Sequence, residues 1–468
     1  MIKPVVLWTD ALIYVLVIVI VVFIAYALRK EYLRAPWRQV ARSSVGMASL
    51  VVLLFYIGIG LLDSIHYRPA LETRGDRGET FYAVEVLSVL DVVLKPLRQH
   101  VEKTYSAPFA TRLYAKETIE LPDGHTVRDF PRLKFGGAHL AAGDNRSADI
   151  LFRGAAGGAA GLGVAVLLAG GVMALLAWRH GTRFSQTMAE VWRGRTAIPW
   201  NVMLITAAVI LALIGATAAL AAKYHVFGTD KVGQDVLYQT LKSIRTALVI
   251  GTLTTLVMLP FAILLGIMAG YLRGWVDDVV QYVYTTLNSI PGVLLIASAV
   301  LLLQVYIDLH PELFDTDAAR ADLRLLFLCI ILGVTNWTDL CRLLRGETLK
   351  LREVEYVQAA VAFGAGRARI MLRHLLPNVM HIVLITVVLG FSGLVLAEAI
   401  LSYVGVGVDP STHSWGNMIN GARLEMARDP MVWWSLAAAF VFMFLLVLAA
   451  NLFSDAVRDA FDPRLRRG

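Results

Sequence analysis

Cysteine is scarce in this chain of 468 residues, which contains only Cys329 and Cys341. Both lie inside one apolar stretch, and no cysteine lies in a connecting segment. The sequence therefore offers neither a disulfide framework nor a CxxC metal site. We interpret both side chains as small apolar groups on a membrane helix, and we expect the chain to bind no metal.

Motifs for catalysis are absent as well. The dipeptide Gly-Lys does not occur, so the chain has no Gly-x-x-x-x-Gly-Lys-Ser/Thr loop to hold nucleotide phosphates. The metalloprotease pattern HExxH and the nucleophile pattern GxSxG are missing too. We expect no catalytic residue and no cofactor on this chain, and a membrane-embedded enzyme has little support.

Charged residues are few, because 17% of the chain is charged while 57% is hydrophobic. Soluble domains are about 25% charged and about 45–50% apolar. A run of about 18 apolar residues crosses a bilayer as a helix. Such runs cover residues 10–28, 45–62, 154–178, 200–222, 247–271, 283–306, 324–341, 380–401 and 432–451. The sequence therefore predicts an all-α polytopic membrane protein with about nine transmembrane helices and with lipid as a partner.

The first apolar run is predicted to span the membrane rather than to be a cleaved signal peptide. It continues without interruption from Val15 to Ala27, and the basic pair Arg29-Lys30 follows it. A signal peptide has a shorter apolar stretch that ends in a small-residue cleavage site.

Basic residues gather in four connecting segments, which share one side of the membrane if nine spans are counted. They lie at residues 29–42, 179–195, 342–373 and 464–467. Short cytoplasmic loops are rich in Lys and Arg, so this side is predicted to be the cytoplasm. The N-terminus is then outside and the C-terminus cytoplasmic. The formal net charge of +7 follows from this bias, and we expect no nucleic acid partner.

Residues 63–152 form a long segment that this orientation places outside the membrane. Phe81 to Tyr105 has the apolar spacing of a helix. Thr118 to Arg128 alternates around Pro122-Asp123-Gly124, which is typical of a hairpin turn. We predict a small external α+β insertion, with a poorly ordered loop as the alternative.

The most informative cytoplasmic segment runs from Tyr356 to Pro377. Its first part, Tyr356 to Phe363, is rich in alanine and uncharged, and Ala is the best helix former. Gly364-Ala365-Gly366 then permits a turn, and a second, basic helix follows that is predicted to end by Pro377. We expect two short helices at about a right angle outside the bilayer. The smooth surface of the first helix requires a protein partner.

This segment resembles the Glu-Ala-Ala loop of bacterial binding-protein-dependent ABC importers, in the dipeptide, oligopeptide and nickel branch. The resemblance implies an ATPase-docking loop made by Tyr356, Val357, Gln358, Ala359, Ala360, Phe363, Gly364, Leu376 and Pro377. Gln358 departs from the family's usual Glu, which keeps the size and the hydrogen bonding but removes a charge.

Three other segments resemble the same branch, in the same order along the chain. The first is an external motif made by Gly228, Thr229, Asp230, Gly233 and Asp235, with Gln234 in place of the usual Arg. The second is Leu401–Gly405 with Ser414–Met418, and the third is Asp459–Arg466.

The resemblance implies a six-helix importer permease core at residues 199–468. The part before it lies outside the resemblance and is divided by the apolar runs. Residues 1–62 hold two extra transmembrane helices, 63–152 the external periplasmic insertion, and 153–198 a third extra helix with a cytoplasmic linker.

The implied function is that of a permease subunit in the cell inner membrane, which imports di- and oligopeptides by alternating access. The implied partners are a second homologous permease, two cytoplasmic ATPases that bind ATP and Mg, and an extracytoplasmic substrate-binding protein. A nickel or other small-solute importer remains an alternative. So do a secondary transporter driven by an ion gradient and a membrane scaffold or sensor.

Four polar or helix-breaking residues inside predicted spans are candidates for the translocation path: Asn288, Pro291, Asp339 and Glu398. Charges inside a membrane are costly and often functional. Asn288 and Pro291 are predicted to break the sixth apolar run, and backbone freed by proline must be buried or line water. The alternatives are a structural kink at Asn288 and Pro291, and interfacial pairing of the two acids, for example with Arg342.

Overall fold

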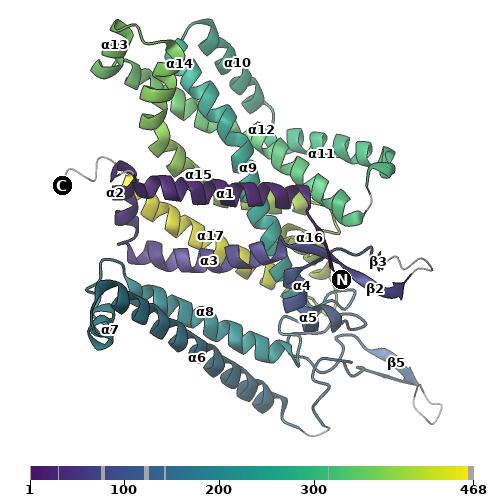
Figure 1. Ribbon diagram of the computed structural model, residues 1–468. Helices are drawn as coiled ribbons and strands as arrows, with labels where there is room; N and C mark the ends of the chain where they lie inside the picture. Colours follow the sequence, from purple (N-terminus) through teal and green to yellow (C-terminus); the bar gives the residue numbers. More distant parts are fainter. Residues whose placement is uncertain are drawn as a thin grey trace.

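The computed structural model describes residues 2–29, 31–74, 80–120, 126–141, 144–314 and 316–461, and most of them are helical. Figure 1 shows long helices beside one another, with a small sheet and irregular segments at one end. Among the described residues, seven helical stretches are long and apolar enough to cross a membrane. They are α3 (Ser44–Asp63), α6 (Arg146–His180), α8 (Trp200–Ala221), α9 (Val236–Leu272), α11 (Gly292–Leu309), α14 to α15 (Arg367–Tyr403) and α17 (Trp434–Phe461). The chain is a multi-pass membrane protein, as predicted.

The predicted count of nine spans is not confirmed. The run at 10–28 lies on α1 (Trp8–Arg29), which is helical over its whole length but is not among the seven stretches. The run at 324–341 lies on α12 (Asp317–Arg352), which carries charged side chains at both ends and is not among the seven. Both runs are helical, and the count of nine spans stays a prediction.

The predicted break in the sixth apolar run is confirmed. The helix α10 (Trp275–Ser289) stops before Ile290, whose backbone is extended, and Pro291 is the N-cap residue of α11. A residue before proline is disfavoured in the helical region, which explains the stop.

Helices α9 and α12 form the long central pair of the molecule. At about 1.5 Å per residue, the 37 residues of α9 extend for about 55 Å, which exceeds the apolar thickness of a bilayer. The two helices approach closely at glycines, since a Cβ on Gly270 would lie 2.8 Å from the carbonyl oxygen of Arg345. Both cysteines are buried on α12 and unbridged, which agrees with their interpretation as small packing side chains.

Helices α6 and α8 form a hairpin along one side (Figure 1). A Cβ on Gly157 or Gly161 of α6 would collide with backbone carbonyl oxygens of α8, at Gly215 and Leu211 respectively. Small residues allow membrane helices to approach in this way. The sequence of α6 therefore specifies a close helix pair.

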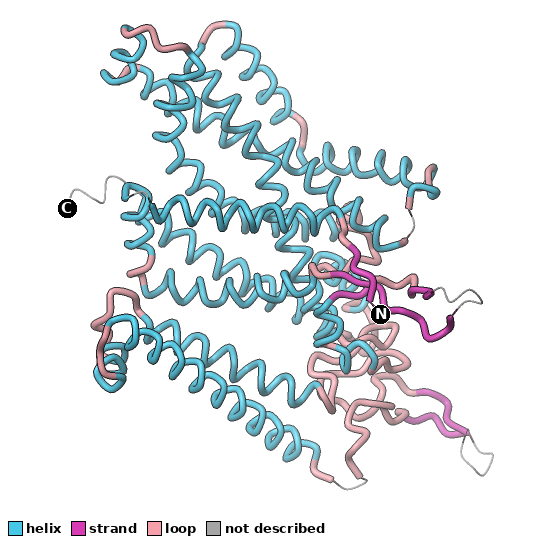
Figure 2. Tube along the Cα trace, viewed as in Figure 1, coloured by secondary structure: helices cyan, strands magenta, loops and turns pink. Residues whose placement is uncertain are grey.

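The shorter elements lie at the ends of the long helices. They are α2 (Glu31–Val40), α4 (Val89–Val93), α5 (Lys95–Gln99), α7 (Phe184–Trp192), η1 (Pro311–Leu313), α13 (Glu355–Ala362) and α16 (Trp415–Glu425). At one end, Trp37 of α2 packs edge-on against Phe461, with 5.5 Å between the ring centroids. The sheet lies at the other end (Figure 2), which we call the insertion end.

The insertion end contains two small β structures. Strand β2 (His66–Arg74) pairs antiparallel with β1 (Ile2–Val5), β3 (Thr80–Tyr82) and β4 (Leu87–Ser88). Strand β5 (Glu117–Glu120) pairs with β6 (Thr126–Asp129). The predicted hairpin is confirmed by these flanking strands, although Pro122-Asp123-Gly124 lies outside the described residues. Because β1 is part of the sheet, the start of the chain lies at the insertion end.

The predicted helix from Phe81 to Tyr105 is wrong. The structure has a strand first, and α4 begins only after Ser88, whose side chain accepts from the backbone N–H of Asp91 in a capping box. Pro96 stands in the first turn of α5, so α4 and α5 are separate short helices. The apolar spacing was correct, but the cap and the proline decide where helices form.

Candidate functional site

Helix α13 ends in a turn that only glycine forms without strain. Gly364 has a φ of +76°, in the left-handed region. The N–H of Ala365 donates to the carbonyl of Ala360 at 3.0 Å, and the N–H of Gly364 donates to Val361 at 2.9 Å. These two bonds make a Schellman cap. The turn predicted at Gly364 is therefore present.

The surface of α13 is divided into a buried and an exposed side. Val357 is completely buried and packs in the cluster that joins α9, α12 and α15, with Ala360 against it. Tyr356 and Ala359 are exposed, and Phe363 is 91% exposed. These exposed side chains lie at the end of the molecule away from the insertion (Figure 1).

Gln358 connects α13 to the preceding helix. Its Nε2 donates to the carbonyl oxygen of Arg352 at 2.9 Å, at the last residue of α12. The guanidinium of Arg352 donates in turn to the carbonyl of Tyr271 in α9 at 3.2 Å. An ionised Glu at position 358 would have no proton to donate to this carbonyl. Gln358, which stands where the family usually has Glu, therefore forms a hydrogen bond within the chain.

The predicted end of the second helix at Pro377 is wrong. Helix α14 (Arg367–Ile370) continues through a π-turn (Met371–Leu375) into α15 (Leu376–Tyr403). Pro377 stands at the beginning of α15, where the wider turn accommodates a residue without an N–H. The basic segment that begins at Arg367 and the apolar helix α15 therefore form one continuous helical stretch.

The beginning of α15 also contacts α13. The side-chain amide of Asn378 donates to the hydroxyl oxygen of Tyr356 at 3.0 Å and to the carbonyl of His374 at 2.6 Å. Leu376 packs against the same cluster as Val357. A displacement of α13 would therefore act on α9, α12 and α15 together.

The external motif is folded around two glycines at the insertion end. Gly228 and Gly233 have φ of +68° and +77°. A Cβ on Gly233 would collide with the carbonyl oxygen of Glu102, and the N–H of Glu102 donates to the carbonyl of Gly233 at 2.9 Å. The hydroxyl of Thr229 donates to the carbonyl of Thr104 at 2.8 Å. The insertion therefore lies directly on the motif.

The two aspartates of the motif hold the local backbone. Asp230 accepts the N–H groups of Val232 and Gln234, both at 2.9 Å. Asp235 is the N-cap of α9 and accepts from the N–H of Leu237 at 2.8 Å. Caps of this kind satisfy the free N–H groups of a helix start. The motif thus sets where α9 begins.

A buried triad, which we call the motif clamp, joins Glu102, His225 and Asp235. Nδ1 of His225 lies 2.7 Å from Asp235 and Nε2 lies 3.4 Å from Glu102. Burial lowers the pKa of His225, but the hydrogen bonds to both carboxylates outweigh it and raise the pKa to about 9. Burial raises the pKa of Glu102, but the bond to His225 and three backbone N–H donors lower it to about 2. Both groups are charged near neutral pH.

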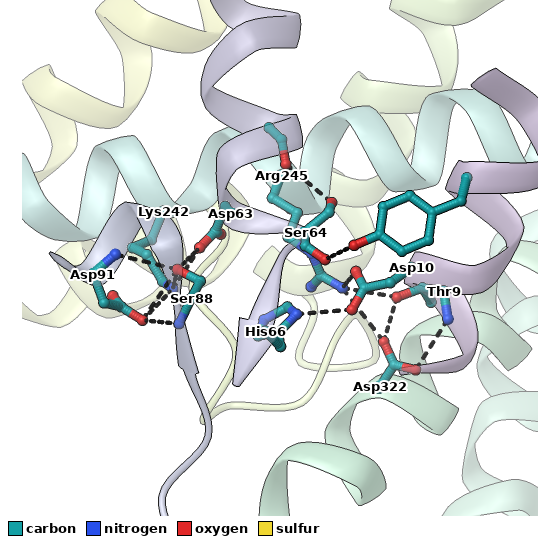
Figure 3. A network of polar contacts seen from close by, with 12 residues as sticks. Thr9, Asp10, Asp63, Ser64, His66, Ser88, Asp91, Lys242, Arg245 and Asp322 are labelled. Carbon is teal, nitrogen blue, oxygen red and sulfur yellow. Dashed lines mark hydrogen bonds and ion pairs between the residues drawn. The ribbon is translucent and has the colours of Figure 1, made fainter. Parts of the chain in front are cut away.

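A second polar network connects α1, α3 and α4 to α9 and α12 and is shown in Figure 3. Arg245 of α9 forms ion pairs with Asp10 of α1 at 2.6 Å and with Asp322 of α12 at 3.6 Å. Lys242 forms ion pairs with Asp63 at 2.6 Å and with Asp91 at 3.2 Å. Buried charges persist only when they are paired. This network holds α1, α3 and the insertion against α9 and α12.

The motif clamp and this network were not predicted from the sequence. Their partners stand up to 313 positions apart, as Thr9 does from Asp322. One signal was available, because Lys242 and Arg245 are charged residues near the beginning of an apolar helix, where a partner is expected.

Among the described residues, no hydrogen bond or ion pair joins one of the four path candidates to another. Asn288 is exposed and accepts from the hydroxyl of Thr338 at 3.0 Å. The side chain of Asp339 is 80% exposed and pairs with Arg342 at 2.7 Å. Glu398 is buried and accepts from the hydroxyl of Ser402 at 2.7 Å. Their role in a path stays a prediction.

Comparison with known proteins agrees with the family resemblance. The family described as binding-protein-dependent transport system inner membrane component matches residues 262–467. The chain is 32% identical over 247 residues to the oligopeptide transport system permease protein OppC of Mycobacterium tuberculosis, covering 52% of this chain and 78% of that protein. It is 32% identical over 243 residues to the dipeptide transport system permease protein DppC of Bacillus subtilis, covering 52% of this chain and 70% of that protein. OppC of Haemophilus influenzae is 30% identical over 243 residues, with 52% and 71% covered. The chain therefore belongs to the family of binding-protein-dependent transport system inner membrane components, as a permease subunit of an importer of the ABC type.

Proposed function

We propose that this chain imports peptides into the cytoplasm by alternating access, as one of two permease subunits in an ATP-driven complex. Relatives from three organisms carry the names of oligopeptide or dipeptide permeases, which supports peptides as the substrate class. The observation that carries the proposal is the exposed apolar side of α13 on a turn fixed by Gly364.

The partners in this proposal are a second homologous permease, two ATPases and a substrate-binding protein. The chain has no phosphate loop, so ATP and Mg belong to the ATPases and the chain itself binds no cofactor. Tyr356, Ala359 and Phe363 then form the contact with an ATPase. Gln358 serves inside the chain rather than in an ion pair with that partner.

Closure of the ATPase pair would push on α13, and the contacts of Val357, Gln358 and Asn378 carry the displacement into α12, α9 and α15. Because α9 and α12 pack against each other from Gly270 and Arg345 to Arg245 and Asp322, a tilt at one end changes the arrangement at the insertion end. A binding protein loaded with peptide shifts the equilibrium only through its differential affinity for the two states.

The proposed orientation places α13 in the cytoplasm and the insertion outside. The N-terminus lies outside with it, since β1 pairs with β2, and the C-terminus is cytoplasmic. The basic residues near α13 support this orientation through the positive-inside rule. The insertion covers the external motif, so in this proposal it takes part in the contact with the binding protein.

Co-purification with the ATPases tests the proposal. The wild type is compared with the double variant Gly364→Asp and Ala360→Arg, and Gly421→Asp on α16 serves as the control, because nothing lies within 4 Å of a Cβ there. We expect the wild type and the control to retain both ATPases and the double variant to lose them while it still inserts. If the wild type retains none, the proposal fails.

A further inference from the structure

A cavity of about 450 Å³ opens at the insertion end, between α11, α12 and the loop before α16. Its volume lies within the range of about 300–1,000 Å³ that small-molecule sites occupy. The polar side chains that line it are Gln304, Asp308, Arg320, Arg324, Asp409 and Ser411.

Arg324 is a buried arginine with too few partners. The residue is 9% exposed, and its Nε has no hydrogen-bond partner in the described structure. Among the described residues it forms one ion pair, to Asp409, and this pair is long at 3.4 Å. A buried guanidinium that leaves donors unused is costly unless a ligand supplies the missing acceptor.

The carboxylate of Asp409 is already occupied from another side. It accepts the backbone N–H of Ser411 at 2.9 Å and the hydroxyl of Ser411 at 2.7 Å. These bonds favour its charged form, and the pKa of Asp409 is lowered although burial acts in the opposite direction. Asp409 therefore holds the loop and gives Arg324 only a partial counter-charge.

Arg320 stands one helical turn before Arg324, on the same face of α12. It forms an ion pair with the exposed Asp317 at 3.9 Å, which is the outer limit for such a pair. Exposed ion pairs of this kind contribute little to stability. Two guanidinium groups with free donors at this spacing match the two oxygens of one carboxylate.

Asp308 of α11 provides the opposite charge in the same cavity. Its carboxylate is exposed and makes no hydrogen bond or ion pair among the residues that the structure describes. The lining thus offers two arginines for an anionic group and one free aspartate for a cationic group.

We propose that this pocket binds a short peptide as a zwitterion, with its carboxylate on Arg320 and Arg324 and its ammonium group on Asp308. The inference rests on the proposed peptide import and adds a receiving site on the permease itself. The site lies at the end of the molecule where the binding protein would release its peptide. Ser411 also lines a neighbouring cavity, together with Asp63 of α3 and His66 of β2, so the site adjoins the sheet of the insertion end.

The experiment measures binding of dialanine to the purified full-length chain in lipid nanodiscs. Dialanine amide, which lacks the carboxylate, and N-acetyl-dialanine, which lacks the ammonium group, are measured in parallel. We expect each blocked peptide to bind about tenfold or more weakly than dialanine, since a charged hydrogen-bonded contact is lost.

The variants Arg320→Gln, Arg324→Lys and Asp308→Asn assign the groups. Arg320→Gln is expected to weaken the binding of dialanine about tenfold and to remove the preference for dialanine over dialanine amide. Arg324→Lys is expected to weaken the binding of dialanine because the forked guanidinium is lost. Asp308→Asn is expected to remove the preference over N-acetyl-dialanine. Arg342→Gln, an exposed arginine at the other end of α12, is the control and is expected to bind as the wild type does. Arg320 is half exposed, so its substitution leaves the fold intact.

Three outcomes overturn the inference. The wild type does not bind dialanine, or Arg320→Gln and Arg324→Lys bind it unchanged, or these variants weaken only the association with the binding protein. The last result would mean that the arginines receive a carboxylate of that protein. ATP-dependent dialanine uptake by the complete wild-type importer is measured separately, and its absence would refute the proposed function rather than the pocket alone.

Discussion

Glu102 and His225 are separated by 123 positions in the sequence, and their side chains meet at 3.4 Å beneath the insertion. His225 belongs to the segment before α9, while Glu102 belongs to the insertion. The contact joins the predicted permease core to the predicted external insertion. The insertion is therefore fixed to the permease core rather than suspended from it.

The motif clamp predicts a dependence of stability on pH. The pKa of His225, about 9, is above its ordinary value of 6.5, so its contribution is complete below about pH 6.5 and is lost as the pH rises through 9. The pKa of Glu102, about 2, is below its ordinary 4.5, so its contribution is complete above about pH 4.5 and is lost as the pH falls toward 2. The clamp is strongest between about pH 4.5 and 6.5.

Thermal unfolding at pH 6 and pH 9.5 measures this effect. We expect the free energy of unfolding of the wild type to be lower by about 3 kcal/mol at the higher pH, because each unit of pKa shift corresponds to about 1.4 kcal/mol. The variant His225→Gln serves as the reference for all other titrating groups and is expected to lose much less. Equal losses in both proteins would contradict the role of His225.

Gly233→Ala is predicted to loosen the insertion. The new methyl group would meet the carbonyl oxygen of Glu102 at a position whose φ is +77°, so both collision and backbone strain destabilise the folded state by about 2–3 kcal/mol. Gly421→Ala, with nothing within 4 Å of a Cβ, is the matched control. The unfolding midpoint of Gly233→Ala should fall clearly below that of the control, and equal midpoints would show that the insertion does not lie on the motif.

Arg245→Met is predicted to be among the most damaging changes at the insertion end. It leaves Asp10 and Asp322 buried without their shared cation, and breaking a buried pair costs about 3–5 kcal/mol. The double variant Arg245→Met with Asp10→Asn should recover part of this loss, because one unpaired charge is removed. A double variant that is less stable than both single variants would be inconsistent with the network.

Gln358→Glu restores the family's usual residue and is still predicted to weaken coupling. The carboxylate would face the carbonyl oxygen of Arg352, to which Gln358 now donates, and the loss of one exposed hydrogen bond costs about 1 kcal/mol. Hydrogen exchange of the α13 backbone should become faster, and peptide-stimulated ATP hydrolysis should fall a few-fold. Unchanged exchange would mean that this contact does not hold α13.

Local signals explain the parts of the fold that the sequence predicted correctly. Gly364 indicated a turn because glycine alone adopts its φ without strain, and Pro291 indicated a break because proline restricts the residue before it. Both effects act within a few residues, so the printed sequence contains them. The membrane helices were visible for the same reason, since apolar length is a local property.

The remaining features depend on contacts between distant residues. Lys242 forms ion pairs with residues of α3 and α4, and no spacing in the sequence indicates these contacts. The helix predicted from Phe81 onward failed because the cap at Ser88 and the ring of Pro96 override the apolar spacing. Arg320 and Arg324 were unremarkable in the sequence, because only the fold places Asp308 opposite them.

ATP-driven uptake in proteoliposomes tests the central claim most directly. The chain is reconstituted with its second permease, the ATPases and the binding protein, and accumulation of labelled dialanine is followed with ATP, without ATP and with an ionophore. The account predicts accumulation that requires ATP, resists the ionophore and disappears in the Gly364→Asp and Ala360→Arg double variant. Accumulation that continues without ATP and collapses with the ionophore would contradict it and would identify a carrier driven by an ion gradient.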